Sequence, residues 1–305
     1  MSGHVFCRDL CLERGEPHSG TGNLAERFIL VRWPRGKWRV PRFESVGMGE
    51  ALAHAIREAM GLGVHVALVD RVGETESLPM LQVDDTVADF DSEAEMAAAI
   101  GRAATGGSIV GRPDPRPVLL CCTDSRRDAC CARYGFATYK ALVAEADPTK
   151  INIVQATHVG GCRFAASLVL LPRRQRYARL GPHEAATFLD RIQRGGIYLP
   201  AWRGEAGLPE AAQVAQKAGM EWAEAHGMPL ASVQLEAMDW PEPTAGASDF
   251  VAPLFVGETR LDIHLVSEVF PVNGHCGGLN EGEAPEMTPR WRALDPAVLP
   301  QTRLD

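Results

Sequence analysis

Residues 117–122, Pro-Val-Leu-Leu-Cys-Cys, form an unbroken apolar run that ends in a cysteine doublet. Apolar continuity over this length predicts a strand that is buried on both faces of a sheet. Residues 131–144 have the pattern of a helix, and residues 151–156, Ile-Asn-Ile-Val-Gln-Ala, predict the next strand. The order strand, helix, strand is that of a βαβ unit, so we expect a small mixed sheet flanked by helices.

The pattern continues on the carboxyl side of this unit. We expect a third short strand, then a helix, then a long amphipathic helix with Pro209 in its first turn. Two strands with alternating polarity near the end of the chain predict a hairpin. The expected ranges are 167–171, 183–194, 208–226, 250–256 and 260–269.

A stretch rich in Gly and Pro, residues 105–117, precedes the first of these strands. Its alternating prolines exclude a helix and favour an extended connection, so we place a domain boundary there. The elements expected before it are strands at 27–33 and 64–70 and a helix at 49–60. The fold class is therefore α/β. The expected parts are a smaller α/β N-terminal domain (1–112), a domain containing the βαβ unit (113–235) and a C-terminal extension with a β-hairpin (236–305).

Composition limits the class of protein. With 305 residues, of which 46% are hydrophobic, the chain can bury a large core. The net charge of -8 argues against nucleic acid as a partner. The densest apolar run, residues 164–171, is far shorter than the ~20 residues of a membrane-spanning helix, so we expect no membrane contact. Eight cysteines without a visible signal peptide predict reduced thiols and a cytoplasmic location.

Four soft metal ligands occur in two close pairs. Cys122 ends the first predicted strand and Cys131 begins the following helix, while His158 and Cys162 follow the second strand. Open α/β sheets place ligands beyond the carboxyl ends of their strands. Gly160-Gly161 allows a tight loop that brings residues 158 and 162 to one side. We therefore expect all four side chains to share one metal centre.

The spacing leaves the metal open. Zinc accepts three cysteines and one histidine, although eight residues between Cys122 and Cys131 is long for a zinc knuckle. Iron-sulfur clusters tolerate wider loops, and two ligands from each of two loops suit the two irons of a 2Fe-2S cluster.

The motifs around these ligands resemble a known family. Cys122-Thr-Asp-Ser-Arg-Arg-Asp128 with Cys131, and Thr157-His-Val-Gly-Gly-Cys-Arg-Phe-Ala-Ala166, are similar to motifs of the sucrase/ferredoxin-like family of thioredoxin-like 2Fe-2S ferredoxins. The resemblance extends over residues 11–225 and includes Arg203-Gly204, residues 213–216 and residues 16–21. It implies a thioredoxin-like ferredoxin domain with flanking helices. It also implies a 2Fe-2S cluster with Cys122 and Cys131 on one iron and His158 and Cys162 on the other.

Position 162 departs from relatives that carry histidine at both positions of the later pair. Ligation by Cys122, Cys131, His158 and Cys162 would be three thiolates and one imidazole. An oxidised core of charge +2 with three thiolates carries a net charge of -1, between the values for two and for four cysteines. We therefore expect a reduction potential between those of plant-type and Rieske-type centres.

The remaining cysteines have weaker signals. Neighbours on a strand point to opposite faces, so only one cysteine of each doublet should reach the cluster. The spacing in the family that the chain resembles favours Cys122 and Cys131, so we expect Cys121 and Cys130 to be buried thiols outside the cluster. Cys7 and Cys11 are a short pair that could bind a second metal, but without clustered partners we expect no site there. Cys276, beside His275 in a Gly-rich stretch, is expected to be a loop residue rather than a ligand. Trp202-Arg203-Gly204 is also expected to form a loop.

The leading hypothesis is a one-electron carrier that accepts from a reductase and donates to another redox protein. The sequence contains no nucleophile elbow, P-loop or dinucleotide-binding motif in a fitting context, which favours an electron carrier over a self-contained enzyme. Whether the chain is also an enzyme is left open. The alternatives are a structural zinc module with the same four ligands and a thiol-disulfide oxidoreductase on a thioredoxin-like fold. The absence of a C-x-x-C pair disfavours the oxidoreductase.

Overall fold

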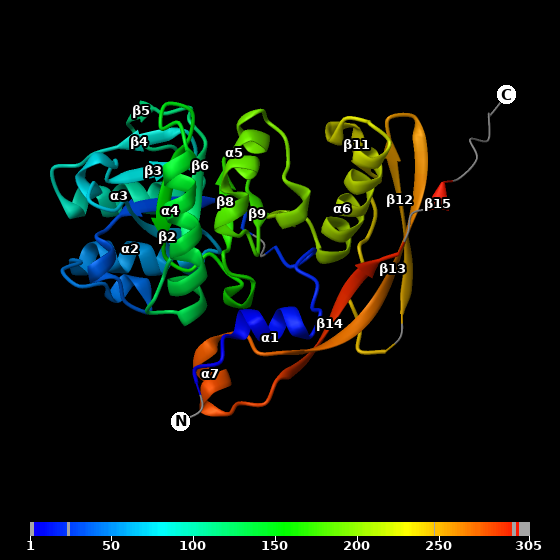
Figure 1. Ribbon diagram of the computed structural model, residues 1–305. Helices are drawn as coiled ribbons and strands as arrows, with labels where there is room; N and C mark the ends of the chain where they lie inside the picture. Colours follow the sequence, from blue (N-terminus) through cyan, green and yellow to red (C-terminus); the bar gives the residue numbers. More distant parts are fainter. Residues whose placement is uncertain (1–2, 23–24, 247, 295–296, 299–305) are drawn as a thin grey trace.

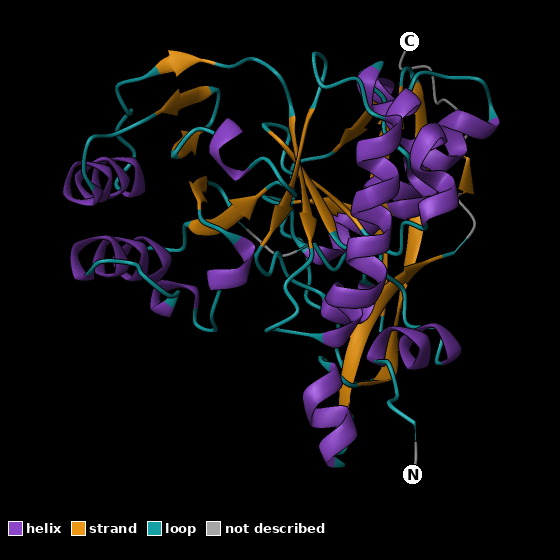
Figure 2. Ribbon diagram, turned by 60° about the vertical axis from the view of Figure 1, so that its left-hand side comes forward, coloured by secondary structure: helices purple, strands orange, loops and turns teal. Residues whose placement is uncertain are grey.

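The computed structural model describes residues 3–22, 25–246, 248–294 and 297–298. A mixed ten-stranded sheet with helices on its faces forms the larger part of the molecule (Figures 1 and 2). Its strand order is β10-β9-β8-β6-β7-β2-β1-β3-β4-β5. The strands are β1 Phe28–Arg32, β2 His65–Asp70, β3 Leu81–Val83, β4 Thr86–Ala88, β5 Arg112–Pro113, β6 Val118–Cys122, β7 Asn152–Ala156, β8 Leu168–Leu171, β9 Gln175–Tyr177 and β10 Trp202–Glu205.

The centre of this sheet has thioredoxin-like topology. β6 and β7 are parallel and are joined by the helix α4 (Phe136–Glu145), whereas β8 pairs antiparallel with β6, and β9 antiparallel with β8. A βαβ unit followed by an antiparallel hairpin, in the order β7-β6-β8-β9, is the core of thioredoxin-like domains. The helices α5 (Ala185–Gln193) and α6 (Glu210–Ala225) follow this core. The βαβ unit expected from the sequence is confirmed.

The N-terminal strands extend the same sheet. β1 and β2 are parallel, and α2 (Glu50–Gly61) and α3 (Glu93–Ala104) bury an apolar core against one of their faces. β2 pairs antiparallel with β7 through Val69 and Asp70, so one sheet continues across the boundary placed near residue 112. That division into domains stays a prediction.

One local expectation is wrong. Trp202-Arg203-Gly204 is not a loop but belongs to strand β10, which pairs with β9 and has an irregular register at this point. Gly204 adopts a φ of 139°, which permits this irregularity. The tripeptide is too short for alternation to reveal a strand in the sequence.

The C-terminal part forms a second, antiparallel sheet in the order β11-β12-β13-β14. Its strands are β11 Val233–Leu235, β12 Asp249–Val256, β13 Thr259–Val272 and β14 Glu286–Ala293, and β15 (Ala297–Val298) pairs with β13. α6 packs its apolar face on this sheet. The expected hairpin is therefore present as β12 and β13, within a larger sheet.

The two terminal helices lie next to each other. The long strands β13 and β14 run away from α6 to the short helix α7 (Cys276–Glu281), and α7 packs beside α1 (Cys7–Glu13) near the N-terminus (Figure 1). Among the described residues, no helix combines the length and apolar character needed to cross a membrane.

Candidate metal centre

The structure brings the four ligands expected from the sequence into one group. The Cys162 thiol lies 3.3 Å from Nδ1 of His158. Cys131 is hydrogen-bonded to the thiols of both Cys122 and Cys162, and Cys122 is also hydrogen-bonded to His158. The contacts form a closed ring in which each side chain touches two others. Such a group can hold a metal through three sulfur atoms and one nitrogen.

Strand alternation decides which cysteine of the first doublet belongs to the group. Cys121 faces the core between the sheet and α4, where its thiol contacts the carbonyl oxygen of Gly135 at 3.4 Å. Cys122 faces the opposite side of the sheet, in the same buried cluster as Cys131 and Cys162. The expectation that only one of these neighbours reaches the group therefore agrees with the structure.

The helix that carries Cys131 approaches the end of β6 unusually closely. Residues Cys131–Gly135 form a π-helical segment, which continues directly into α4. A Cβ atom added at Gly135 would lie 2.0 Å from the carbonyl oxygen of Cys122. Only glycine allows this contact, and the contact sets the separation between Cys122 and Cys131. π-segments inside helices are often found at functional sites.

The loop after β7 is held by three arginines from distant parts of the chain. Gly160 and Gly161 have φ values of 94° and 76°, which turn the loop back between His158 and Cys162. Three consecutive carbonyl groups of this loop each accept a hydrogen bond from a guanidinium. The pairs are Arg42 with His158 (3.0 Å), Arg176 with Val159 (2.5 Å) and Arg203 with Gly160 (3.0 Å).

Two of these arginines also interact electrostatically with the thiols, Arg42 with Cys122 and Arg203 with Cys162. Arg176 and Arg203 are almost completely buried, at 1% and 3% exposure, and burial lowers the pKa of both. Within the part of the chain that the structure describes, no carboxylate lies at ion-pair distance from Arg176. Buried cations of this kind stabilise negative charge at a neighbouring site. No motif in the sequence indicated that Arg42 or Arg176 lies near the centre.

Asp124 links the two ligand loops. Its carboxylate accepts hydrogen bonds from the amides of Arg126 and Arg127, which fix the turn after β6. It also accepts one from the amide of His158 in the other loop, at 3.2 Å. Burial, and then the nearby Cys122, raise the pKa of Asp124.

The electrostatics of the group favour thiolates at Cys122 and Cys162, whereas hydrogen bonds with these two residues raise the pKa of Cys131 and keep it a thiol. Hydrogen bonding from Cys131 lowers the pKa of Cys122, and lowers that of Cys162 to about 7. For His158, burial acts against the charged form, but contacts with the two thiols outweigh it and raise its pKa to about 9. An imidazolium surrounded by thiolates marks a place where a metal cation can replace protons.

The four side chains differ in exposure. Cys122, Cys131 and Cys162 are at most 3% exposed, whereas His158 is only partly buried. His158 lies at a surface cleft together with Gly160 and Arg203. Charged residues of both signs, including Arg163, Glu210 and Arg290, form the rest of this cleft. The imidazole is therefore the part of the group nearest to solvent.

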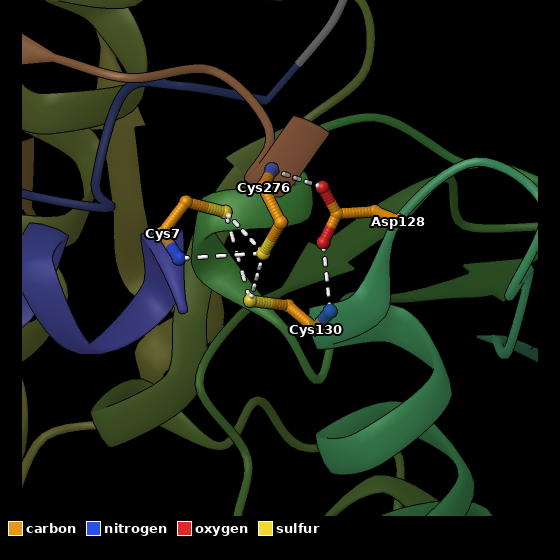
Figure 3. A group of neighbouring side chains, drawn as sticks. All are labelled: Cys7, Asp128, Cys130 and Cys276. Carbon is orange, nitrogen blue, oxygen red and sulfur yellow. Dashed lines mark hydrogen bonds between the residues drawn. The ribbon is translucent and has the colours of Figure 1, made fainter. Parts of the chain in front are cut away.

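A second group of thiols lies close to the first. Cys7, Cys130 and Cys276 converge beside Asp128 (Figure 3). Asp128 is within 4.8 Å of ligand atoms in both groups. Cys130 is thus a buried thiol outside the first group, as expected. Cys276 begins helix α7 and is 2% exposed, so its interpretation as a loop residue is wrong.

Cys7 and Cys11 do not form a pair. Both lie in α1, but the Cys11 thiol donates to Glu16 and accepts from Arg179, away from the Cys7 thiol. The sequence interval between Cys7, Cys130 and Cys276 is large, so spacing alone could not have revealed their association.

A scan against protein-family models matches residues 19–204 to the sucrase/ferredoxin-like family. The chain belongs to this family. The match covers more than half of the 305 residues and includes all four residues of the first group. No match was found among curated proteins.

Solved structures of thioredoxin-like 2Fe-2S ferredoxins from Aquifex aeolicus are similar to part of the chain. One such structure is 14% identical, covers 31% of this chain and 96% of its own, and has a TM-score of 0.29. A wild-type crystal structure at 1.5 Å resolution is 13% identical, covers 30% and 98%, and has a TM-score of 0.27. The likeness is confined to less than a third of the sucrase/ferredoxin-like chain.

Proposed function

We propose that this sucrase/ferredoxin-like protein is a one-electron carrier with a 2Fe-2S cluster held by Cys122, Cys131, His158 and Cys162. The observation that carries the proposal is the closed ring of contacts among these side chains. Two ligands come from the loop after β6 and two from the loop after the parallel strand β7. Such a cluster, when bound, supplies a site that gains and loses one electron.

The donor set fits the cluster chemically. Three thiols and one imidazole satisfy two irons with two protein ligands each. The π-helical segment Cys131–Gly135 packs closely against the end of β6 at Gly135 and so keeps Cys122 and Cys131 near each other as one pair. The turn at Gly160-Gly161 keeps His158 and Cys162 together as the other pair. Arg176 and Arg203 donate hydrogen bonds to carbonyl groups of the second loop, and their charges offset added negative charge.

His158 supports exchange of electrons with a partner protein. It is the least buried of the four residues and lies at a surface cleft, where a partner protein can approach the cluster through the imidazole. Arg163 and Arg290 in the same cleft already pair with the buried Glu16. The ring also has a nitrogen that can take or release a proton. A cytoplasmic location belongs to the same proposal, because all eight cysteines are unpaired thiols suited to a reducing compartment.

The test is a metal and sulfide count on protein purified without oxygen. The proposal expects about two iron and two labile sulfide per chain bound at this centre, with visible absorption that dithionite bleaches. Cys122→Ser should lose both. Cys121→Ser is the matched control, because it changes the neighbouring buried thiol on the opposite face of β6. A colourless protein whose zinc is lost in Cys122→Ser would overturn the electron-carrier proposal in favour of a structural zinc module.

A further inference from the structure

The three thiols of the second group form a compact triangle. Sγ of Cys130 lies 3.2 Å from Sγ of Cys276 and 3.6 Å from Sγ of Cys7, and the Cys7–Cys276 distance is 3.6 Å (Figure 3). All three residues are at most 2% exposed. Three thiols brought together in this way exceed what core packing requires, because a buried free cysteine needs only apolar neighbours.

The distances favour a shared metal over a disulfide. A tetrahedral metal with bonds of about 2.3 Å to sulfur separates its sulfur ligands by about 3.8 Å. The observed separations of 3.2 to 3.6 Å need only a small expansion to reach that value. A disulfide between Cys130 and Cys276 would instead require their sulfur atoms to approach to about 2.05 Å.

Backbone amides already surround the sulfur atoms. The amide of Arg8 donates to the Cys130 thiol, and the amide of Cys7 donates to the Cys276 thiol, both at 3.4 Å. Hydrogen bonds from amides stabilise thiolate over thiol. These contacts come from the first turn of α1, where amides have no partner within the helix.

Asp128 holds two of the cysteines in place. Its oxygens accept hydrogen bonds from the amides of Cys130 and Cys276, each at 2.7 Å (Figure 3). Because both oxygens already accept hydrogen bonds, we assign Asp128 the role of positioning the cysteines and do not count it among the ligands.

His4 is the donor that we assign to the fourth position. Its exposed side chain interacts with the Cys276 thiol, but its ring does not lie within 4.8 Å of all three sulfur atoms, so it must move inward to bind the same metal. His4 and Cys7 are separated by two residues, which is within the usual spacing of paired ligands in structural zinc sites. The His4 ring packs edge-on against Phe6, the residue before Cys7.

We propose that His4, Cys7, Cys130 and Cys276 form a structural zinc site, separate from the centre at Cys122. The thiols lose their protons to solvent when the metal binds, and the metal's charge offsets the buried thiolates. Zinc fits this closed Cys3His set, in which no position is left for a substrate.

The position of the proposed site indicates a role in holding distant segments of the chain together. It joins three segments that are 123 to 269 residues apart: α1, the helix start that carries Cys130, and α7. Asn280 of α7 adds a pair of hydrogen bonds to the backbone of Val5. Because Cys130 directly precedes Cys131, a metal here would fix α1 and α7 against the segment that carries a ligand of the first centre.

The experiment is zinc analysis of the full-length protein, purified with zinc present and then dialysed. The proposal expects about one zinc per chain in the wild type and less than about a tenth of that in Cys7→Ser and Cys276→Ser. Cys11→Ser is the matched control, one helical turn from Cys7 in α1, and should keep its zinc. Cobalt substitution should give thiolate-to-metal absorption in the wild type that Cys276→Ser lacks.

His4→Ala keeps the test informative if the cysteine variants do not fold. This exposed side chain can be removed without opening the core, and zinc affinity should fall at least tenfold. Three results would overturn the proposal: no zinc in the wild type, equal zinc loss in Cys11→Ser, or a Cys130–Cys276 disulfide detected by mass spectrometry. Zinc that disappears in Cys122→Ser but not in Cys7→Ser would belong to the first centre, so failure of each proposal has its own signature.

Discussion

The carboxylate of Asp124 accepts a hydrogen bond from the backbone amide of His158, 3.2 Å away, and so connects the two loops that carry the candidate ligands. The bond joins residues 34 positions apart, and the carboxylate is only 2% exposed. The relative position of Cys122 and His158 therefore depends on one buried carboxylate.

Asp124→Ala should loosen the centre. Loss of a buried, charge-assisted hydrogen-bond acceptor leaves amides unpaired and should cost about 2 kcal/mol of unfolding free energy. Iron retained after dialysis should fall with it, as measured by metal analysis. Asp91→Ala changes an exposed aspartate outside both ligand loops and should retain wild-type stability and iron. Equal iron retention in both variants would show that Asp124 does not position the loops.

Gly135→Ala should separate the first ligand pair. The added Cβ would meet the Cys122 carbonyl oxygen at 2.0 Å, so the helix must move away from β6 at a cost of about 1 to 3 kcal/mol. Denaturant unfolding and iron content measure the two effects.

Gly101→Ala is the control for the same change in a helix. Gly101 lies inside α3, and a Cβ there meets nothing within 4 Å. This variant should be stabilised by about 0.5 to 1 kcal/mol, since alanine is the better helix former. If both variants behave alike, the close approach at Gly135 is not required.

Arg176→Met should lower the reduction potential of the proposed cluster. Removal of one buried positive charge disfavours the more negative, reduced state, and a shift on the order of tens of millivolts is expected at intermediate dielectric. Arg194→Met is the control, because the Arg194 side chain is 76% exposed and pairs with Asp190. Redox titration followed by visible absorption gives both values, and an equal potential in the two variants would contradict the electrostatic role.

Stability should decrease as the pH falls below about 6.5. Burial, and then the nearby charge of Lys217, lower the pKa of His18 to about 3, and burial also lowers that of His65. Between pH 3 and pH 6.5 the unfolded chain therefore binds more protons at His18 than the folded protein does, so acid favours unfolding. Each histidine contributes up to about 1.4 kcal/mol per pH unit.

The variant His18→Gln tests this pH dependence. It should reduce the slope of unfolding free energy against pH between 4 and 6.5, as read from denaturant titrations. His54→Gln changes an exposed histidine of α2 and should leave the slope as in the wild type. An unchanged slope in His18→Gln would show that His18 is not held neutral.

The sequence predicted the local parts of the centre well. The apolar run ending at Cys122 and the strand ending before His158 place both loops at one edge of the sheet, and alternation separates Cys121 from Cys122. These inferences need only neighbouring residues. The family resemblance added the pairing of the loops, and the match over residues 19–204 confirms the family.

Contacts between distant segments could not be predicted in this way. Arg42 lies in a short turn between β1 and α2, and Arg203 lies in the edge strand β10, yet both reach the loop after β7. Only the tertiary fold brings them together. The group formed by Cys7, Cys130 and Cys276 depends on α1 and α7 packing beside each other, because no short spacing connects its members. Trp202-Arg203-Gly204 was missed as a strand because three residues are too few to show alternation, and its pairing with β9 is visible only in the structure.

A substitution at His158 tests the proposed set of three thiolates and one imidazole most directly. With three thiolates and one imidazole, the cluster should have a potential above the ~-400 mV of plant-type ferredoxins. His158→Cys adds one negative charge to the ligand set and should lower that potential. A potential equal to that of the wild type would remove His158 from the ligand set.

The most direct measurement is pulsed EPR of the dithionite-reduced protein, which detects nitrogen bound to the cluster. The account predicts a 2Fe-2S signal with one strongly coupled histidine nitrogen in the wild type, and the same type of signal without that coupling in His158→Cys. A reduced cluster without nitrogen coupling in the wild type, or coupling that persists in His158→Cys, would contradict ligation by Cys122, Cys131, His158 and Cys162.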